Sequence, residues 1–300
     1  MSLAPVALFT YNRPVHTRQV IETLQRNRLC PETDLFIFSD GPKPGISVLS
    51  VKEVRDFLKS IQGFKTVRII ERETNMGLAA NIIDGVGKIV NEFGTVIVLE
   101  DDLLTSAFFL EYMNEALRIY QEEATVACIH GYVYPVHEKL PESFFLRGAD
   151  CWGWATWKRG WDLFEPDGGK LMQRLLDSGL TYQFDFAGSY PYTEMLKDQI
   201  MGKNNSWAIR WYASAFLEDK YTLYPGRSMI SNIGGDGSGT NNGYSYTSPA
   251  ILSEEAPKLE KIDVAENTFA YEAFSKYHRR ASHPDLFTRI KRQFKMLFKS

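Results

Sequence analysis

Three consecutive carboxylates, Glu100-Asp101-Asp102, carry the strongest chemical signal in this sequence of 300 residues, and they directly follow an apolar stretch, residues 95–99. Adjacent carboxylates repel one another when they are ionised, so a cation is expected beside them. Carboxylate oxygens suit Mg²⁺ or Mn²⁺, which take one or two protein carboxylates and leave other positions to phosphate. The triplet therefore predicts a divalent-metal site. The alternative is a solvated turn whose acids cap a helix beginning near Thr105.

Other polar residues follow three further apolar stretches, residues 5–10, 34–38 and 66–70. These residues are, in order, Thr10, Asn12 and Arg13, then Asp40, then Asn75 and Gly77. All four apolar stretches are short and rich in β-branched residues, as buried parallel strands are. Because ligands of open α/β sheets bind at the carboxyl ends of the strands, we expect these polar residues at one edge of a sheet.

Helix-length segments separate the predicted strands: residues 16–27, 50–61 and 78–93. Gly85 and Gly87 weaken the prediction for the third helix. Alternation of strand and helix predicts an α/β fold with a parallel sheet.

Several common sites are missing from the sequence. No G-x-G-x-x-G follows the first strand and no G-x-x-x-x-G-K-[ST] occurs, which disfavours dinucleotide-binding folds and P-loop NTPases. No G-x-S-x-G occurs, so a hydrolase with a nucleophile elbow is not supported. The five histidines and three cysteines show neither H-x-x-x-H nor C-x-x-C spacing, so a zinc site is not expected.

The composition is that of an ordinary globular protein, with 44% hydrophobic and 24% charged residues. A formal charge of -3 gives no electrostatic case for a nucleic-acid partner. Three widely spaced cysteines, a start without signal-peptide features and no apolar run near the roughly 18 residues of a membrane span predict a cytoplasmic protein.

The motifs above, taken in order, resemble those of GT-A glycosyltransferases. Residues 10–14 (TYNRP), Ser39-Asp40, Asn75-x-Gly77 and the acidic triplet are similar to inverting enzymes of the N-acetylglucosaminyltransferase I type and to bacterial family A sugar transferases. The resemblance continues through three later segments and covers about residues 4 to 245. These segments are residues 100–112, 145–166 and 228–240.

The resemblance implies a GT-A (Rossmann-like), mostly parallel sheet flanked by helices, with an aromatic-rich acceptor half. Residues 1–125 would form the nucleotide-sugar-binding half and residues 126–250 the acceptor half of the same domain. Residues 251–300 would form a C-terminal helical extension.

The resemblance also implies roles for single residues. Asp102 would be the direct metal ligand, whereas Glu100 and Asp101 would reach the ribose and the sugar of the donor. Thr10, Asn12 and Arg13 would line the nucleotide, Asp40 would lie near the base or ribose, and Asn75 and Gly77 would shape the loop beneath it. The alternatives are a simple turn at Asp40 and a turn or helix cap at Asn75.

One departure from the family concerns the general base. The resembled enzymes carry an acidic residue in a Trp-Asp-type motif, but residues 206–211 (SWAIRW) contain no carboxylate. An attacking hydroxyl must lose its proton, so a base is normally required. Asp150 and Asp198 are the candidates, and Asp150 is preferred because it precedes the Gly-Trp segment. The alternative for Asp150 is an ion pair with Arg147.

Six tryptophans lie in the second half of the chain, four of them within residues 152–161. Indole rings stack on sugars but more often fill cores. We expect two at an acceptor cleft, Trp207 and either Trp152 or Trp154, and the rest buried.

These observations predict a metal-dependent glycosyltransferase that uses Mn²⁺ or Mg²⁺ and a nucleotide sugar, by resemblance a UDP-sugar. It would move the sugar with inversion to a hydroxyl of a carbohydrate or glycolipid acceptor, in polysaccharide or glycoconjugate assembly. The alternatives are a nucleotidyltransferase and a non-catalytic carbohydrate-binding relative.

Two further segments carry predictions of their own. The Gly-rich residues 232–244 would close over the diphosphate, as in the resembled family. The amphipathic, basic residues 287–300 would either make weak peripheral contact with the inner face of a membrane or pack as a terminal helix on the domain.

Overall fold

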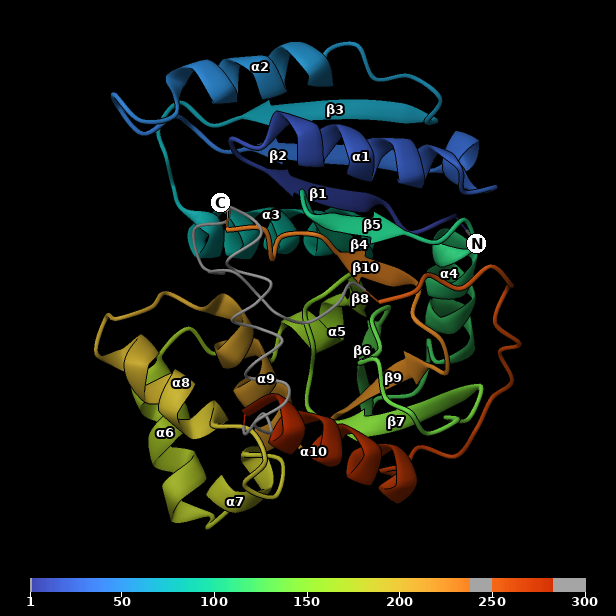
Figure 1. Ribbon diagram of the computed structural model, residues 1–300, viewed down its shortest axis with the longest axis vertical. Helices are drawn as coiled ribbons and strands as arrows, with labels where there is room; N and C mark the ends of the chain where they lie inside the picture. Colours follow the sequence, from blue (N-terminus) through green and yellow to red (C-terminus); the bar gives the residue numbers. More distant parts are fainter. Residues whose placement is uncertain (1, 238–249, 283–300) are drawn as a thin grey trace, which may run out of the picture.

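The computed structural model describes residues 2–237 and 250–282. Within these residues one eight-stranded sheet has the order β3-β2-β1-β4-β8-β6-β9-β7 (Figure 1). Its strands are β1 (Val6–Thr10), β2 (Asp34–Ser39), β3 (Thr66–Glu71), β4 (Thr95–Glu100), β6 (Val126–His130), β7 (Ser143–Arg147), β8 (Trp154–Trp157) and β9 (Tyr221–Pro225). A separate two-stranded sheet pairs β5 (Leu103–Thr105) with β10 (Ile230–Asn232).

The first four strands run parallel, with β1 between β2 and β4. β8 pairs antiparallel with β4 and β6, and β7 pairs antiparallel with β9, so the rest of the sheet is mixed. Each strand predicted in the first hundred residues is present, with its ends within one residue of the prediction. The α/β fold with a mostly parallel sheet flanked by helices is therefore confirmed.

Helices connect and cover these strands. In the first half they are α1 (Pro14–Gln25), α2 (Val48–Leu58), α3 (Leu78–Phe93) and α4 (Phe109–Ile119). In the second half they are α5 (Lys158–Trp161), α6 (Gly168–Asp177), α7 (Thr181–Phe184), α8 (Tyr192–Ile200), α9 (Trp207–Leu217) and α10 (Thr268–Ser282).

Helix α3 has the predicted bounds, although it contains two glycines. A Cβ at Gly85 would lie 2.7 Å from the ring of Phe9, so a residue without a side chain lets the helix pack closely on β1. The helix predicted to begin near Thr105 is wrong: residues 103–105 form β5 and α4 begins at Phe109. The reason is tertiary, because β5 gains its pairing from β10, far along the chain.

Most tryptophans form part of the core rather than a cleft. Trp154 packs against Trp161, Trp207 and Trp211 with ring centroids 5.5–5.7 Å apart. Trp207 is only 3% exposed, so its predicted place at an acceptor cleft is wrong. Trp152 is half-buried, with its ring 4.7 Å from that of Tyr132.

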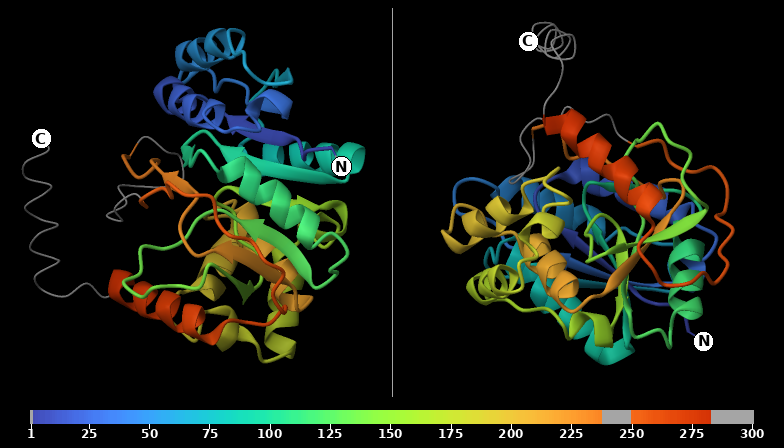
Figure 2. Two further views of the ribbon diagram at one scale, coloured as in Figure 1. Left: turned by 90° about the vertical axis from the view of Figure 1, so that its right-hand side faces the viewer. Right: turned by 90° about the horizontal axis from the view of Figure 1, so that it is seen from below.

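Helix α10 lies on the outside of the molecule beside β7 (Figures 1 and 2). Phe274 of this helix meets the rings of Phe144, Tyr224 and Tyr134. No helix in the described part of the chain is long and apolar enough to cross a membrane. The segment 287–300 lies outside the described residues, as does most of the Gly-rich segment 232–244. The predicted division into residues 1–125, 126–250 and 251–300 stays a prediction.

Candidate active site

The site lies at the topological switch point of the sheet, between β1 and β4. The chain leaves β1 toward β2 on one side, whereas β4 lies on the other side. Ligands of open α/β sheets bind in the crevice outside the strand ends at such a switch point. Phe9 is aligned with Glu100, so the residues after β1 and those after β4 emerge side by side.

Arg13 and the acidic triplet meet in this crevice. The Nη2 atom of Arg13 donates to Asp101 Oδ1 and, over 3.0 Å, to Asp102 Oδ2. The backbone N–H of Tyr11 donates to the other oxygen of Asp101 at 3.3 Å. The side chains of Arg13, Asp101 and Asp102 are 14%, 6% and 9% exposed. The structure thus brings together three residues that the sequence placed after different strands.

The three carboxylates outnumber the one guanidinium that they share. Burial raises the pKa of Glu100 to about 8, and the charges of Asp102 and Asp101 add to the rise. Burial also raises the pKa of Asp101 and outweighs the opposite effect of Arg13. Burial lowers the pKa of Arg13, but the two aspartates more than compensate and hold it above its ordinary value. Such a cluster favours a further cation.

The segment after β10 covers Asp102. The backbone N–H of Ile233 donates to the carbonyl of Asp102 at 2.9 Å. A Cβ at Gly234 would lie 2.1 Å from Asp102 Oδ2, so only glycine fits this position without a shift. His16 Nε2, in the first turn of α1, lies 3.2 Å from Asp236 Oδ2. The sequence signalled this segment only as a Gly-rich run, and it did not reveal the pairing of His16 with Asp236.

The residues present fit a divalent cation that is shared with substrate phosphates. Within residues 2–237 and 250–282 no group of three or more His, Cys, Asp or Glu could hold a metal alone. A Mg²⁺ or Mn²⁺ ion that is shared with a phosphate needs only one or two protein carboxylates, which Asp102 and the adjacent Asp101 would supply. Arg13 is a cation that forms ion pairs with both of these aspartates. Thr10 Oγ1 and Arg13 Nη1 are buried and have no hydrogen-bond partner among residues 2–237 and 250–282.

Asp40 holds the neighbouring loop. Its Oδ1 accepts from the backbone N–H groups of Gly41 and Met76, both at 2.8 Å. Its Oδ2 accepts from Asn75 Nδ2 and the backbone N–H of Gly77, both at 3.0 Å. Gly77 has φ +76°, a backbone conformation that favours glycine, and it precedes α3. The four bonds use the usual acceptor positions of a carboxylate, so Asp40 shapes this loop.

Thr10 and Asn12, the other residues predicted to line the nucleotide, lie next to the cluster of Arg13 with the acidic triplet and the cluster around Asp40. The backbone N–H of Asp40 donates to the carbonyl of Thr10 at 2.9 Å, which joins the clusters at the end of β1. Asn12 is half-buried in the turn before α1. Contact of Thr10, Asn12, Asp40, Asn75 or Gly77 with a nucleotide stays a prediction.

Asp150 is held by neighbours other than the expected one. Its carboxylate accepts from the backbone N–H of Cys151 at 2.8 Å and from Tyr224 Oη at 3.1 Å. The alternative of an ion pair with Arg147 is wrong, because Arg147 Nε pairs with Asp219 at 3.2 Å. The side chain of Asp150 is 25% exposed, so one quarter of it is open to an acceptor.

A histidine and several tyrosines surround Asp150. His130 Nε2 lies 3.6 Å from Asp150 Oδ1 and accepts from the backbone N–H of Trp152 at 3.1 Å. Burial lowers the pKa of His130, which keeps the ring neutral. Burial raises the pKa of nearby tyrosines and the charge of Asp150 adds to the rise. These are Tyr132, Tyr134, Tyr190, Tyr192 and Tyr224.

Cys151 is half-buried and follows Asp150 in the chain. Burial raises the pKa of its thiol, and the charges of both Asp150 and Glu100 add to the rise. The thiol therefore lies within electrostatic reach of both carboxylates. Asp198, on α8, differs, because it forms an exposed ion pair with Lys203 at 2.9 Å. A catalytic role of Asp150 or Asp198 stays a prediction.

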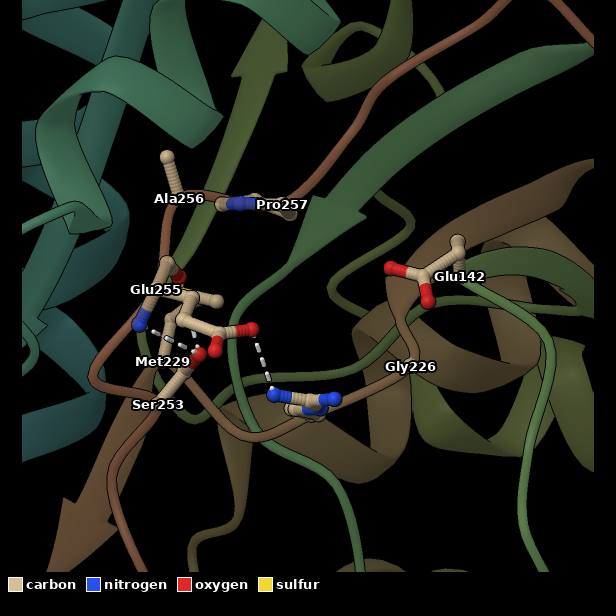
Figure 3. A pocket seen from close by; sticks show the side chains of 8 residues that line it. Glu142, Gly226, Met229, Ser253, Glu255, Ala256 and Pro257 are labelled. Carbon is tan, nitrogen blue, oxygen red and sulfur yellow. Dashed lines mark hydrogen bonds and ion pairs between the residues drawn. The ribbon is translucent and has the colours of Figure 1, made fainter.

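A separate small pocket lies beside β9 and the segment before α10 (Figure 3). It is lined by Glu142, Gly226, Arg227, Met229, Ser253, Glu255, Ala256 and Pro257. Arg227 pairs with Glu255 at 2.8 Å. None of the predicted site residues lines this pocket.

No protein-family model and no curated protein matches this chain. Parts of it are similar to solved structures, each with a TM-score of 0.32. One is a mannosyltransferase, PcManGT from Pyrobaculum calidifontis in complex with GDP-Man and Mn²⁺, at 12% identity over 44% of this chain and 36% of that chain.

Another is S. aureus TarS, at 15% identity over 49% of this chain and 24% of that chain. A third is S. aureus TarS 1–349, at 11% identity over 53% of this chain and 48% of that chain. The similarity spans less than half the length of each of those chains. At this level it carries no functional argument, and the function below rests on the residues of this chain.

Proposed function

We propose that this protein is a metal-dependent glycosyltransferase that moves a sugar from a UDP-linked donor to a hydroxyl acceptor with inversion. The observation that carries the proposal is the buried pair Asp101–Asp102 at the switch point between β1 and β4, with Arg13 as its cationic partner. Buried carboxylates at the ligand-binding edge of an α/β sheet are costly unless a cation accompanies them.

The donor end has the features that a diphosphate requires. The N-terminus of α1 places the positive end of a helix at the crevice, and Arg13 and His16 lie in or next to its first turn. Asp102 would hold Mn²⁺ or Mg²⁺, which would stabilise the negative charge on the departing diphosphate. The segment of Ile233 and Gly234 covers this position. UDP rather than another nucleotide follows from the family resemblance alone.

The acceptor end lies around Asp150. As the acceptor oxygen attacks the anomeric carbon, the bond from that carbon to the diphosphate breaks and the hydroxyl proton passes to the Asp150 carboxylate. A single displacement of this kind inverts the configuration of the anomeric carbon. The hydrogen bonds from Cys151 and Tyr224 fix the orientation of the carboxylate. Half-buried aromatic rings such as Trp152 offer surfaces for a sugar ring.

The two alternatives differ in what supports them. A nucleotidyltransferase would normally carry a basic Gly-rich loop after the first strand, where this chain has Asn12-Arg13-Pro14. A non-catalytic carbohydrate-binding relative is favoured by the absence of a carboxylate in residues 206–211. Only an enzyme would release UDP in an acceptor-dependent way.

The test is release of UDP from a panel of UDP-sugars with Mn²⁺, with and without candidate acceptor glycans. We expect acceptor-stimulated release by the wild type and its loss in Asp102→Asn. Asp56→Asn, which removes an exposed carboxylate paired with Lys52, is the matched control and should release UDP at the wild-type rate. Equal release by Asp102→Asn and wild type would contradict the proposal.

A further inference from the structure

We propose that Arg13 occupies the metal position on Asp101 and Asp102 in the ligand-free protein and leaves it only when a nucleoside diphosphate arrives with the metal. This inference rests on the proposed function, since it concerns the same two aspartates. It adds a competition between a side chain of this protein and the metal, and it predicts that the metal and the nucleotide strengthen each other's binding.

Arg13 already contacts both aspartates at oxygens that a metal would need. A single nitrogen of Arg13, Nη2, bonds to Asp101 Oδ1 and to Asp102 Oδ2. All three side chains are at most 14% exposed, so water screens these charges poorly. A divalent cation on Asp102 Oδ2 would lie against the guanidinium, and two cations at that distance repel each other strongly. The two therefore exclude each other.

Asp102 Oδ2 also lies close to the segment that follows β10. A Cβ at Gly234 would come within 2.1 Å of this oxygen, so the backbone of Gly234 already lies close to it. The backbone N–H of Ile233 holds the carbonyl of Asp102. A metal at this oxygen would therefore crowd both Arg13 and the covering segment, and of the two only Arg13 carries a charge that the metal repels.

The side chain of Arg13 can move without a change in the fold. Its backbone carbonyl accepts from the backbone N–H and from Oγ1 of Thr17, both at 2.9 Å, which fixes the main chain at the start of α1. The side chain has a long flexible stem. Its Nη1 is buried and has no hydrogen-bond partner in the described part of the chain, and a phosphate oxygen would satisfy this donor.

The consequence is a coupling between metal and nucleotide. Metal alone would have to expel Arg13 and leave a buried guanidinium unpaired, so it binds weakly. A diphosphate gives the guanidinium new partners and frees the aspartates, so each ligand strengthens binding of the other by the same factor.

Arg13→Gln tests this inference, with binding of Mn²⁺ alone as the readout. Free Mn²⁺ is counted by electron paramagnetic resonance, first without nucleotide and then with saturating UDP. We expect Arg13→Gln to bind Mn²⁺ alone on the order of tenfold more tightly than wild type, and UDP about tenfold more weakly in the presence of Mn²⁺. Arg18→Gln is the control: this arginine lies on the same helix, over the ring of Phe57, and should change neither affinity.

The change in affinity for Mn²⁺ alone distinguishes competition by Arg13 from simple phosphate binding. An arginine that only binds phosphate would leave the affinity for Mn²⁺ alone unchanged, and that result would overturn the inference. The proposed function would still stand if the wild type bound UDP together with Mn²⁺. A wild type that binds no UDP with Mn²⁺ would overturn both.

If Arg13→Gln does not fold, Arg13→Lys serves as the second variant. It keeps the charge but loses the planar fork, so it should compete less well with the metal. We expect Mn²⁺ alone to bind more tightly than in the wild type, by a smaller factor than in Arg13→Gln. Affinity equal to that of wild type would overturn the inference.

Discussion

At the scale of single residues, the site is defined by charges that the fold cannot balance by itself. Glu100, Asp101 and Asp102 share one guanidinium, and all lie in or next to a crevice where ligands of α/β proteins bind. The sequence predicted these residues as a group. It did not predict that Arg13 would bridge the two aspartates, because that contact depends on the pairing of β1 with β4 and on one side-chain rotamer.

Asp102→Ala tests the metal assignment by binding. We expect the variant to lose the tightening of UDP binding that Mn²⁺ gives the wild type, because Asp102 is the predicted direct ligand. The fold should be retained, since Arg13 keeps Asp101 as its partner. Isothermal titration of UDP with and without Mn²⁺ measures the effect. A metal-dependent gain in affinity equal to that of the wild type would refute the assignment.

Asp150→Asn tests the acceptor end. Loss of a general base lowers turnover by about 10²–10⁴-fold, and UDP affinity should stay at the wild-type value because the donor site is untouched. Asp198→Asn removes the other candidate, an exposed carboxylate paired with Lys203, and should retain activity. If turnover falls in Asp198→Asn and not in Asp150→Asn, the roles of the two aspartates are reversed.

At the scale of elements, the sequence predicted the strands and helices that depend on local hydrophobic periodicity. Buried strands and amphipathic helices of the first hundred residues carry their own periodicity, and β1 to β4 and α1 to α3 appear where expected. Strand β5 has three residues and exists because β10 pairs with it from 125 residues along the chain. No local signal could reveal this pairing, and therefore none could reveal that Gly234 covers Asp102.

Two glycines in α3 give a matched test of packing. A Cβ at Gly85 would lie 2.7 Å from the ring of Phe9, whereas the nearest atom to a Cβ at Gly87 is 3.8 Å away. Gly85→Ala should lower the free energy of unfolding by about 1–3 kcal/mol because the core becomes overpacked. Gly87→Ala should raise it by up to about 1 kcal/mol through helix propensity. Urea unfolding measures both, and a stabilising Gly85→Ala would contradict the packing.

Helix α10 makes stability depend on pH through His278. Burial lowers the pKa of this residue to about 4, against a smaller opposing effect of Asp150. The unfolded chain, with an ordinary pKa near 6.5, therefore takes up the proton first. The contribution of His278 is present above pH 6.5 and is lost as the pH falls toward 4, by about 2 kcal/mol between pH 7 and 5.

His278→Phe should reduce that loss, since phenylalanine takes up no proton and the surrounding rings of Tyr134 and Tyr190 accept an aromatic residue. Urea unfolding at pH 7 and pH 5 compares the variants. His137→Asn, which alters an exposed histidine, is the control and should keep the wild-type dependence. An unchanged dependence in His278→Phe would show that His278 is not responsible.

At the scale of the whole molecule, one sheet joins a part with parallel strands to a mixed part, and four of the tryptophans lie in one core cluster. The sequence predicted the order of these parts. It could not predict that Trp207 is buried against Trp154, because several indoles in one region fit a core as well as a cleft. Trp207 becomes buried only when α9 packs against Trp154 of β8.

The central claim is that UDP and a divalent metal bind together at Asp102. The most direct measurement is the melting temperature of the full chain with Mn²⁺ alone, UDP alone and both. Ligand at 100 times its Kd stabilises a protein by about 2.7 kcal/mol, which shifts the melting temperature by several degrees. We predict that UDP with Mn²⁺ raises it by more than the sum of the separate shifts. A melting temperature that UDP with Mn²⁺ leaves unchanged would contradict the account.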